Sequence, residues 1–370
     1  MIRRIALPTI LSASPGRSEP DKYCQKAEEY ENLPMQRFVS ANPTGMTVWL
    51  YFVFMNASVA VCTHNRADYL VKALDSLCTQ SLPLNQFEVL VIDNASHDST
   101  VSVVADTKHK LSNLRYVFEP ELGLSKARNT ALAEIRAEYI AYLDDDAIAS
   151  PQWLERILNA FESIKPKPGL VGGRVEPIWE GVRPKWLPGE LMGYLTIVDW
   201  SDEPKTLDPS QQYVAGANMA FVTSVLRDIG GFDLRLGRVG NSLLSCEEIL
   251  LQRRLFMLDH AIYYDPLVAV SHHVPVSRLT QQWFFDRVFS QGVSEAVMRT
   301  NMEHLSRIKR VVLALRSLAG FIARPKLWSS CLLSSDDPIH FLWRCRGLKQ
   351  LGTSWGLISY SSPDSERPVA

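Results

Sequence analysis

Apolar runs and amphipathic segments alternate along the chain from residue 58 onward. The apolar runs, which leave no polar face, lie at 58–62, 87–92, 115–118 and 139–143. Apolar residues recur at helical spacing between them, in segments at 70–77, 99–111 and 124–137. Strands that alternate with helices predict a parallel sheet covered on both faces. The predicted fold class is therefore α/β, with a mainly parallel central sheet flanked by helices.

Polar residues follow each predicted strand, at the edge of the sheet where such folds bind ligands. These clusters are Thr63-His64-Asn65-Arg66, Asp93-Asn94-Ala95-Ser96, Glu121-Leu122-Gly123 and Asp144-Asp145-Asp146. Three carboxylates at a strand end are costly to bury without compensation and are typical of a site for a hard divalent cation. The triplet therefore predicts a metal-dependent enzyme.

Glycine is absent from residues 46–122, which include the first two predicted βα units. This absence excludes both a glycine-rich dinucleotide-binding turn and a P-loop after the first strand. A phosphorylated ligand at this edge would need a metal ion to neutralise it.

Composition and charge are ordinary for a globular protein of 370 residues, with 46% hydrophobic and 21% charged residues. The net charge of −1 provides no general field for nucleic acid, so we expect no nucleic-acid partner. The six cysteines form no C-x-x-C pair and predict isolated thiols in a reducing compartment, hence a cytoplasmic protein.

Three regions are predicted, with boundaries at residues 55/56 and 299/300. Residues 1–55 are interpreted as a weakly ordered extension, with Met46 or Met55 as an alternative natural start. A signal peptide at 2–14 is the minor alternative, because Pro8 interrupts its apolar stretch. The apolar run at 48–55 is too short to span a membrane, which needs about 20 residues.

Five motifs, in order, resemble those of the family 2 glycosyltransferases over about residues 58–299. They are Val61-Cys62-Thr63-His64-Asn65-Arg66, Val91-Ile92-Asp93-Asn94-Ala95-Ser96, Gly123-Leu124-Ser125-Lys126-Ala127-Arg128-Asn129, Leu143-Asp144-Asp145-Asp146 and Val214-Ala215-Gly216-Ala217-Asn218-Met219. The resemblance implies the GT-A fold, inverting sugar transfer from a nucleotide-diphosphate donor, and Mn²⁺ or Mg²⁺. Residues 240–248 with 278–283 are also similar to enzymes of bacterial, especially cyanobacterial, exopolysaccharide synthesis.

The resemblance also suggests how the donor binds. Asp93 can accept the ring N–H of uracil, and Thr63 with Arg66 can hold base, ribose or phosphate. Lys126 and Arg128, at the start of a predicted helix, suit a diphosphate. The alternatives are a helix cap for Asp93 and a solvated basic face for the two cations. The other predicted substrate-binding residues are Asn65, Asn94, Asn129, Gly216, Ala217 and Asn218.

The triplet corresponds to the D-x-D motif of the family, with Asp144 and Asp146 as metal ligands and Asp144 also near the ribose. Alternate residues of a strand share a face, so Asp145 points elsewhere and is predicted to contact the sugar. His272 resembles the residue that completes the metal site in some relatives. A purely structural histidine is the alternative.

An inverting transfer requires a base that takes the proton of the acceptor hydroxyl. Glu247 and Glu248 precede an apolar helical pattern, so both lie at a helix N-terminus. We predict Glu248 as the base because it matches the residue that closes the acidic motif of the family. Glu247 is the second candidate, and helix capping is the alternative for both. Cys246 replaces a glycine that is common in the family.

Residues 301–360 carry nine Lys or Arg and three Asp or Glu, a local charge of +6. Apolar residues from Leu305 to Ile322 follow helical spacing between the cations. The pattern predicts either peripheral contact with the inner face of a membrane or a helix packed on the catalytic domain.

The leading functional hypothesis is transfer of sugar from a UDP-sugar to a polysaccharide, glycan or lipid-linked acceptor. A D-x-D phosphotransferase or phosphatase is the enzymatic alternative, and a non-catalytic sugar-nucleotide binding protein is the third.

Overall fold

The computed structural model describes residues 35–41, 47–53, 56–240, 242–332 and 335–360. The chain divides into two units, Met1–Phe54 and Met55–Ala370. In the first unit, β1 (Met35–Ala41) and β2 (Thr47–Val53) pair as an antiparallel hairpin. The candidate signal peptide and both candidate start residues lie outside the described residues. The predicted boundaries at 55/56 and 299/300 stay predictions.

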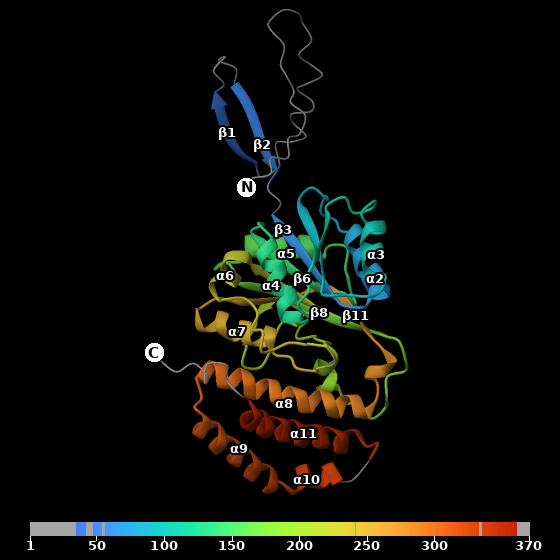
Figure 1. The fold of residues 1–370 in the computed structure, drawn as a ribbon, viewed down its shortest axis with the longest axis vertical. Helices are drawn as coiled ribbons and strands as arrows, with labels where there is room; N and C mark the ends of the chain where they lie inside the picture. The colour runs from blue at the N-terminus through green and yellow to red at the C-terminus, as the bar shows by residue number, and fades with distance from the viewer. Residues whose placement is uncertain (1–34, 42–46, 54–55, 241, 333–334, 361–370) are drawn as a thin grey trace, which may run out of the picture. The chain divides into compact units, whose positions relative to one another are not determined.

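The second unit is built on a nine-stranded sheet (Figure 1). Its first four strands run parallel in the order β5-β4-β3-β6. Their bounds are β3 (Ala57–Thr63), β4 (Phe87–Asp93), β5 (Leu114–Phe118) and β6 (Tyr139–Asp144). Every residue of β4 is buried, as expected for a strand covered on both faces. The sequence prediction of an α/β fold with a mainly parallel sheet is confirmed for this half.

The remaining strands make the sheet mixed. They are β7 (Ala147–Ala149), β8 (Leu170–Trp179), β9 (Lys205–Thr206), β10 (Asn218–Val222) and β11 (Ile262–Val274). Strand β10 runs antiparallel to both β6 and β8, whereas β8 and β11 are parallel to each other. Strands β7 and β9 pair antiparallel with β11. This arrangement places β7, which directly follows the aspartate triplet, beside the end of β11.

Helices connect the parallel strands where the apolar spacing predicts them. They are α2 (Ala67–Cys78), α3 (Thr100–Thr107) and α4 (Leu124–Glu134), and α2 buries Leu70, Leu74 and Leu77. Later helices are α5 (Trp153–Ser163), α6 (Thr223–Asp228) and α7 (Glu247–Met257), with short 3₁₀ helices η1 (Gly189–Leu195) and η2 (Val276–Arg278). Helices α3 and α4 pack on β4, while α5 and α7 pack on β11.

The order of the parallel strands determines where a ligand can enter. The chain moves outward from β3 to β4 and β5, then returns to place β6 on the other side of β3. Loops after β3 and β6 therefore diverge, and open α/β sheets bind ligands in the crevice at such a switch point. Residues 63–66 and 144–146 lie at this point.

Four helices follow the sheet, namely α8 (Gln281–Glu303), α9 (Arg307–Ile322), α10 (Pro325–Leu332) and α11 (Pro338–Ser359). Helix α11 packs on α8, and α9 and α10 pack on α11 and form the outer layer (Figure 1). Glycines allow α8 and α11 to meet closely, since a Cβ on Gly292 would lie 2.1 Å from the Lys349 carbonyl oxygen. None of the helices within the described ranges is long and apolar enough to cross a membrane.

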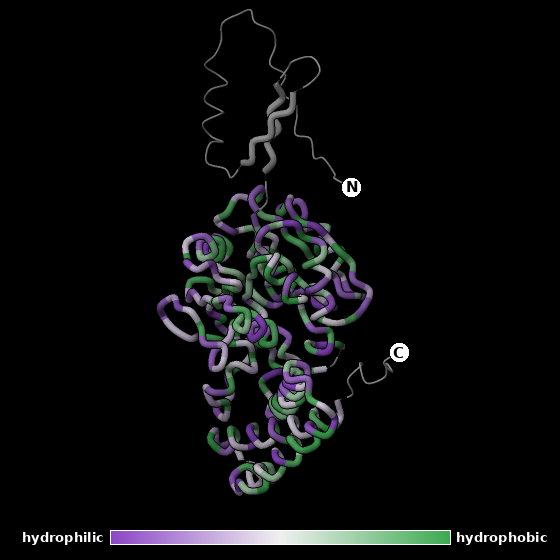
Figure 2. Tube along the Cα trace, turned by 90° about the vertical axis from the view of Figure 1, so that its left-hand side faces the viewer, coloured by the Kyte–Doolittle hydropathy of each residue, from purple (hydrophilic) through white to green (hydrophobic). Residues whose placement is uncertain are grey.

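Helix α9 turns most of its apolar side chains toward solvent. Its buried residues are Arg310 and Ala314. Arg310 donates a hydrogen bond to the carbonyl of Tyr360, the residue after α11. This bond keeps the face of α9 that carries Arg310 and Ala314 turned toward the protein. The exposed apolar residues of α9 are Ile308, Val311, Val312, Leu315 and Ile322. Figure 2 shows apolar and polar residues interleaved along these outer helices.

Candidate active site

A cavity of about 300 Å³ opens at the switch point between β3 and β6. The sequence-predicted residues that line it are Thr63, Arg66, Asn94, Arg128, Asp144, Asp145, Asp146, Gly216, Ala217, Glu247, Glu248 and His272. These residues come from β3, β6, β11, α4, α7, the loops that follow β3, β4 and β6, and the segment directly before β10. The fold therefore brings most of the candidate site together from distant parts of the sequence.

Two aspartates and one histidine form a group that could hold a metal ion. Ligand atoms of Asp144, Asp146 and His272 all lie within 4.8 Å of one another. His272 reaches the group because β11 pairs with β7, and its Nε2 lies 3.2 Å from Asp146 Oδ1. Two carboxylates and an imidazole are donors that suit Mn²⁺ or Mg²⁺. The residues present therefore fit the metal that the sequence predicts.

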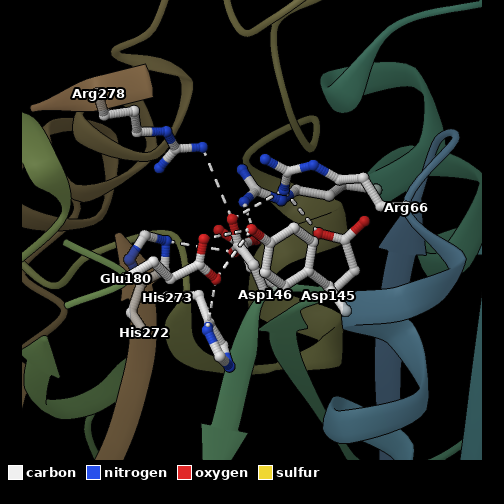
Figure 3. Close-up of polar contacts among 10 residues, drawn as sticks. Arg66, Asp145, Asp146, Glu180, His272, His273 and Arg278 are labelled. Carbon is white, nitrogen blue, oxygen red and sulfur yellow. Dashed lines mark hydrogen bonds and ion pairs between the residues drawn. The ribbon is translucent and has the colours of Figure 1, made fainter. Parts of the chain in front are cut away.

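The Asp146 carboxylate is surrounded by cationic side chains. Arg66 Nη1 lies 2.8 Å from Asp146 Oδ2 and 2.9 Å from Asp145 Oδ1. Arg278 Nη2 lies 3.6 Å from Asp146 Oδ2, and Figure 3 shows the two arginines approaching from different sides. Burial alone would raise the pKa of Asp146, but His272, Arg66 and Arg278 outweigh it and hold that pKa well below its usual range. This carboxylate is a permanent anion at neutral pH.

Arg128 connects the aspartate group to the glutamate pair. Its guanidinium, only 2% exposed, donates to Asp144 Oδ1 at 3.0 Å and to Glu247 Oε1 at 2.9 Å. It also donates to the carbonyl of Gly216 at 3.2 Å. A Cβ at position 216 would lie 2.9 Å from Arg128 Nη2, so glycine leaves room for this contact. The sequence predicts a diphosphate contact for Arg128, whereas its observed contacts hold the site together.

The two glutamates at the start of α7 have different surroundings. Glu247 is buried, with one oxygen bound by Arg128 and the other, Oε2, without a hydrogen-bond partner among the described residues. Glu248 is half-buried, but its Oε2 atom is enclosed and has no hydrogen-bond partner among the described residues. Burial, and then the charge of Glu247, raises the pKa of Glu248 to about 8. Glu248 therefore exchanges a proton near neutral pH, as a general base must.

Cys246, directly before α7, adopts a left-handed conformation with φ of 74°. L-residues with a Cβ rarely adopt this conformation, whereas glycine does so without penalty. The thiol is buried and accepts a hydrogen bond from Gln291 Nε2 at 3.1 Å. A residue other than glycine thus maintains the turn that directs the glutamates into the cavity.

Several predicted donor-binding residues make contacts within the protein. Asp93 is buried, and its carboxylate accepts from the Ser96 amide at 2.9 Å and the Tyr116 hydroxyl at 2.7 Å. Asn94 lines the cavity, and its side-chain oxygen accepts from the Gly123 amide at 2.7 Å. Asn65 accepts from the His97 amide at 2.7 Å and lies outside the cavity lining. The uracil contact predicted for Asp93 stays a prediction.

Asp93 also lies outside the cavity lining, as do three other predicted residues. Lys126 pairs with Glu121 at 2.8 Å. Asn129 exchanges two hydrogen bonds of 2.8 Å with the backbone of Phe232. Asn218 is fully buried and accepts from Trp153 Nε1 at 2.8 Å. These contacts hold the walls of the site, and the substrate contacts predicted for these residues stay predictions.

Sequence reasoning did not assign a role to three arginines in the cavity. Arg238, Arg278 and Arg287 line it together with His64 and Thr196. The sequence offers no signal for Arg238 or Arg287, because a lone arginine in a loop or helix resembles any surface cation. Arg278 could have been found through the motif at 278–283, where the sequence already resembles related enzymes.

A network beside the triplet holds the end of β11. Glu180 accepts hydrogen bonds from the Tyr69 hydroxyl at 3.0 Å and lies 2.9 Å from His273 Nδ1 (Figure 3). The His273 amide donates to the Asp146 carbonyl at 2.9 Å. His273 thus positions the backbone of the triplet, while its neighbour His272 faces the carboxylates.

Comparisons with known proteins agree with this site. Residues 58–230 match the family model described as glycosyl transferase family 2. The glucosyl-dolichyl phosphate glucuronosyltransferase of Haloferax volcanii is 24% identical over 247 residues, which cover 66% of this chain and 77% of that protein. The poly(ribitol-phosphate) beta-N-acetylglucosaminyltransferase TarS of Staphylococcus aureus is 33% identical over 234 residues, 63% of this chain and 39% of that protein.

Among solved structures, the mannosyltransferase PcManGT from Pyrobaculum calidifontis in complex with GDP-Man and Mn²⁺ has a TM-score of 0.49. It is 20% identical, and the match covers 93% of this chain and 84% of that chain.

The mixed sheet, its switch point and the acidic cavity define an enzyme of the GT-A class. Residues 58–230 are similar to glycosyl transferase family 2, and the chain is a glycosyltransferase. This assignment confirms the predicted fold and enzyme class. It argues against the two alternative hypotheses, a phosphotransferase or phosphatase and a non-catalytic binding protein.

Proposed function

We propose that the protein is an inverting, metal-dependent glycosyltransferase that moves a sugar from a UDP-sugar to a polysaccharide, glycan or lipid-linked acceptor. The observation that carries this proposal is one cavity lined by both a group that could hold a metal ion and a glutamate of raised pKa. Two such groups in one site match the two needs of the reaction, which are a stabilised leaving group and a base.

The metal site consists of Asp144, Asp146 and His272, with Mn²⁺ or Mg²⁺ as the ion. The bound ion supplies positive charge that stabilises the leaving nucleoside diphosphate. Arg66 and Arg278, which lie against Asp146, keep its carboxylate ionised and add positive charge facing the same region. Asp145, paired with Arg66, is the remaining member of the triplet and is assigned to the sugar.

Glu248 is the proposed base. The acceptor oxygen attacks C1 of the donor sugar, the bond from C1 to the diphosphate oxygen breaks, and the diphosphate leaves with the bonding electrons. Glu248 takes the hydroxyl proton of the acceptor. Glu247 is less suited, because Arg128 already binds one of its oxygens at 2.9 Å. Attack from the face opposite the diphosphate inverts the configuration at C1.

The test is calorimetric titration of UDP into the protein, once with Mn²⁺ and once with EDTA. We expect UDP to bind at least about ten-fold more tightly with Mn²⁺, because the site has carboxylates and no glycine-rich phosphate loop. Equal affinities would remove the metal from the proposal. A panel of nucleotide sugars, scored by release of the diphosphate, then identifies the donor.

We also propose that α9 and α10 contact an anionic membrane surface, where a lipid-linked acceptor would be presented. Apolar and basic side chains are exposed together on these helices, and the relative from Haloferax volcanii carries a dolichyl phosphate in its name. The exposed cations are Arg307, Lys309, Arg316, Arg324 and Lys326. Each basic residue near such a surface contributes about 1 kcal/mol, and the apolar face adds to it.

Sedimentation with anionic vesicles at low salt tests this contact. Replacing Ile308, Leu315 and Ile322 by serine removes exposed apolar area without opening the core, so we expect the variant to pellet less than the wild type. The matched control replaces Val182 and Met257, which are 92% and 71% exposed elsewhere on the surface. Equal pelleting of wild type and variant would reject the membrane contact.

A further inference from the structure

Arg238 and Arg287 differ from the other arginines of the cavity in having no acidic partner. Arg66 and Arg128 each pair with two carboxylates, and Arg278 lies 3.6 Å from Asp146. Among the described residues, no carboxylate oxygen lies within 4.0 Å of the guanidinium of Arg238 or Arg287. Neither positive charge therefore has an ion-pair partner among the described residues, although Arg287 lies 5.6 Å from the centre of the Tyr194 ring.

Both arginines are held where such a charge is costly. Arg287, on α8, is 9% exposed, and its Nη1 donates to the neutral side chain of Gln291 at 2.9 Å. Its Nε has no hydrogen-bond partner among the described residues. Burial, and then the charges of Arg278 and Arg287, lowers the pKa of Arg238 to about 10. Like charges kept together in a partly dry cavity favour an anion that neutralises them.

The contacts of Arg287 place this positive charge on the side of the base. Gln291, which Arg287 contacts, donates to Cys246 Sγ at 3.1 Å and accepts from the Ser245 hydroxyl at 2.8 Å. These residues directly precede Glu247 and Glu248. The metal-binding aspartates, in contrast, face Arg66 and Arg278. The charge of Arg287 thus adjoins the place where the acceptor must deliver its hydroxyl.

We propose that Arg238 and Arg287 bind an anionic group of the substrates other than the donor diphosphate. A phosphate or a carboxylate fits, since two guanidinium groups can each donate two parallel hydrogen bonds to either. The group is carried by the acceptor, as a phosphate near its reacting hydroxyl, or by the donor sugar, as a carboxylate. This inference rests on the proposed function, because it assigns the class of substrate that the same cavity selects.

The experiment uses the full chain with Mn²⁺ and two probes. Glycerol phosphate is titrated into protein saturated with UDP, which tests an acceptor phosphate. UDP-glucuronate is compared with UDP-glucose, which tests a donor carboxylate. The variants are Arg238→Gln and Arg287→Gln, with Arg299→Gln as the control, because Arg299 lies on α8 like Arg287 but is exposed and paired with Glu303 at 2.9 Å.

We expect one of the two probes to bind the wild type and to lose about ten- to hundred-fold in affinity in both variants. UDP affinity should change less than about two-fold, and the control should match the wild type. The melting temperature of Arg238→Gln should not fall, because the change relieves repulsion. Arg238→Lys, which keeps the charge, should retain part of the affinity.

Two results would overturn the inference. If the variants weaken UDP itself as much as the probes, the arginines belong to the diphosphate site. The wild-type protein could also bind UDP but neither probe. In that case the cavity does not select an anionic substrate, and the proposed function still stands. Wild type that binds no nucleoside diphosphate with Mn²⁺ would reject the proposed function, and this inference with it.

Discussion

Two acidic groups in one cavity have opposite surroundings. Asp146 lies against His272, Arg66 and Arg278, and its pKa is held well below the usual range although the side chain is buried. Glu248 has an enclosed oxygen without a partner among the described residues, and burial beside Glu247 raises its pKa to about 8. Asp146 therefore stays an anion because His272, Arg66 and Arg278 outweigh its burial, whereas burial and the charge of Glu247 allow Glu248 to accept a proton.

Arg128 lies between the two acidic groups and forms an ion pair with one member of each. Its two terminal nitrogens bind Asp144 and Glu247, so each acidic group has one member fixed by the same buried cation. The members that remain are Asp146, the proposed metal ligand, and Glu248, the proposed base. A single side chain thus helps to assign different tasks to four carboxylates.

The largest expected effect comes from removing the charge of Asp146. Asp146→Asn should lower turnover on the order of 10⁴-fold, because it removes a metal ligand and with it stabilisation of the leaving group. It should also lower the melting temperature, because Arg66, Arg278 and His272 lose their shared anion; breaking a buried pair costs roughly 3–5 kcal/mol. Sugar-transfer assays and thermal melts measure both. Normal turnover would show that the aspartate group is not the metal site.

Glu248→Gln is expected to lower turnover by about 10²–10⁴-fold while UDP and Mn²⁺ binding remain. The amide keeps the shape of the side chain but cannot take the acceptor proton. Glu247→Gln is the comparison, and it should reduce melting temperature as well, since it weakens the contact with buried Arg128. Full turnover in Glu248→Gln would transfer the role of base to Glu247.

The next largest expected effect is the dependence of turnover on pH. A base is active when deprotonated, so a raised pKa for Glu248 means that turnover falls as pH falls below about 8, by at most ten-fold per pH unit. Asp146, whose pKa is lowered, contributes no change in this range. We expect the residual activity of Glu248→Gln to lose this dependence. A wild-type rate that is flat between pH 6 and 8 would contradict the assignment.

The parallel strands β3 to β6 and the helices between them could be predicted from the sequence. Each βα unit there repeats the same pattern, which is an apolar run, a polar cluster and then an amphipathic segment. Thr63, Arg66 and Asp144 follow apolar runs directly, so the parallel-sheet rule alone places them at one edge. His272 follows a strand-like run too, although its contact with Asp146 depends on the antiparallel pairing of β11 with β7, which no local pattern encodes.

The roles of several cationic residues could not be predicted from the sequence. Lys126 and Arg128 are two residues apart, and the sequence predicts a diphosphate contact for both. In the structure Lys126 pairs with Glu121, whereas Arg128 is buried between Asp144 and Glu247. Only the tertiary fold separates them. Arg287 reaches the cavity from α8, a helix that the family resemblance does not describe in detail. Charge partners that lie far apart in sequence determine these roles.

The smallest expected effect concerns the backbone that directs the glutamates. Cys246 has φ of 74°, and a left-handed conformation costs an L-residue about 1 kcal/mol relative to glycine. Cys246→Gly and Cys246→Ala both remove the buried thiol and its contact with Gln291, so their difference isolates the backbone term. We expect the glycine variant to be more stable than the alanine variant by roughly 0.5–1 kcal/mol in denaturant unfolding. The reverse order would mean that the residue before Glu247 and Glu248 is not left-handed. The direction of the two glutamates into the cavity would then need another structural cause.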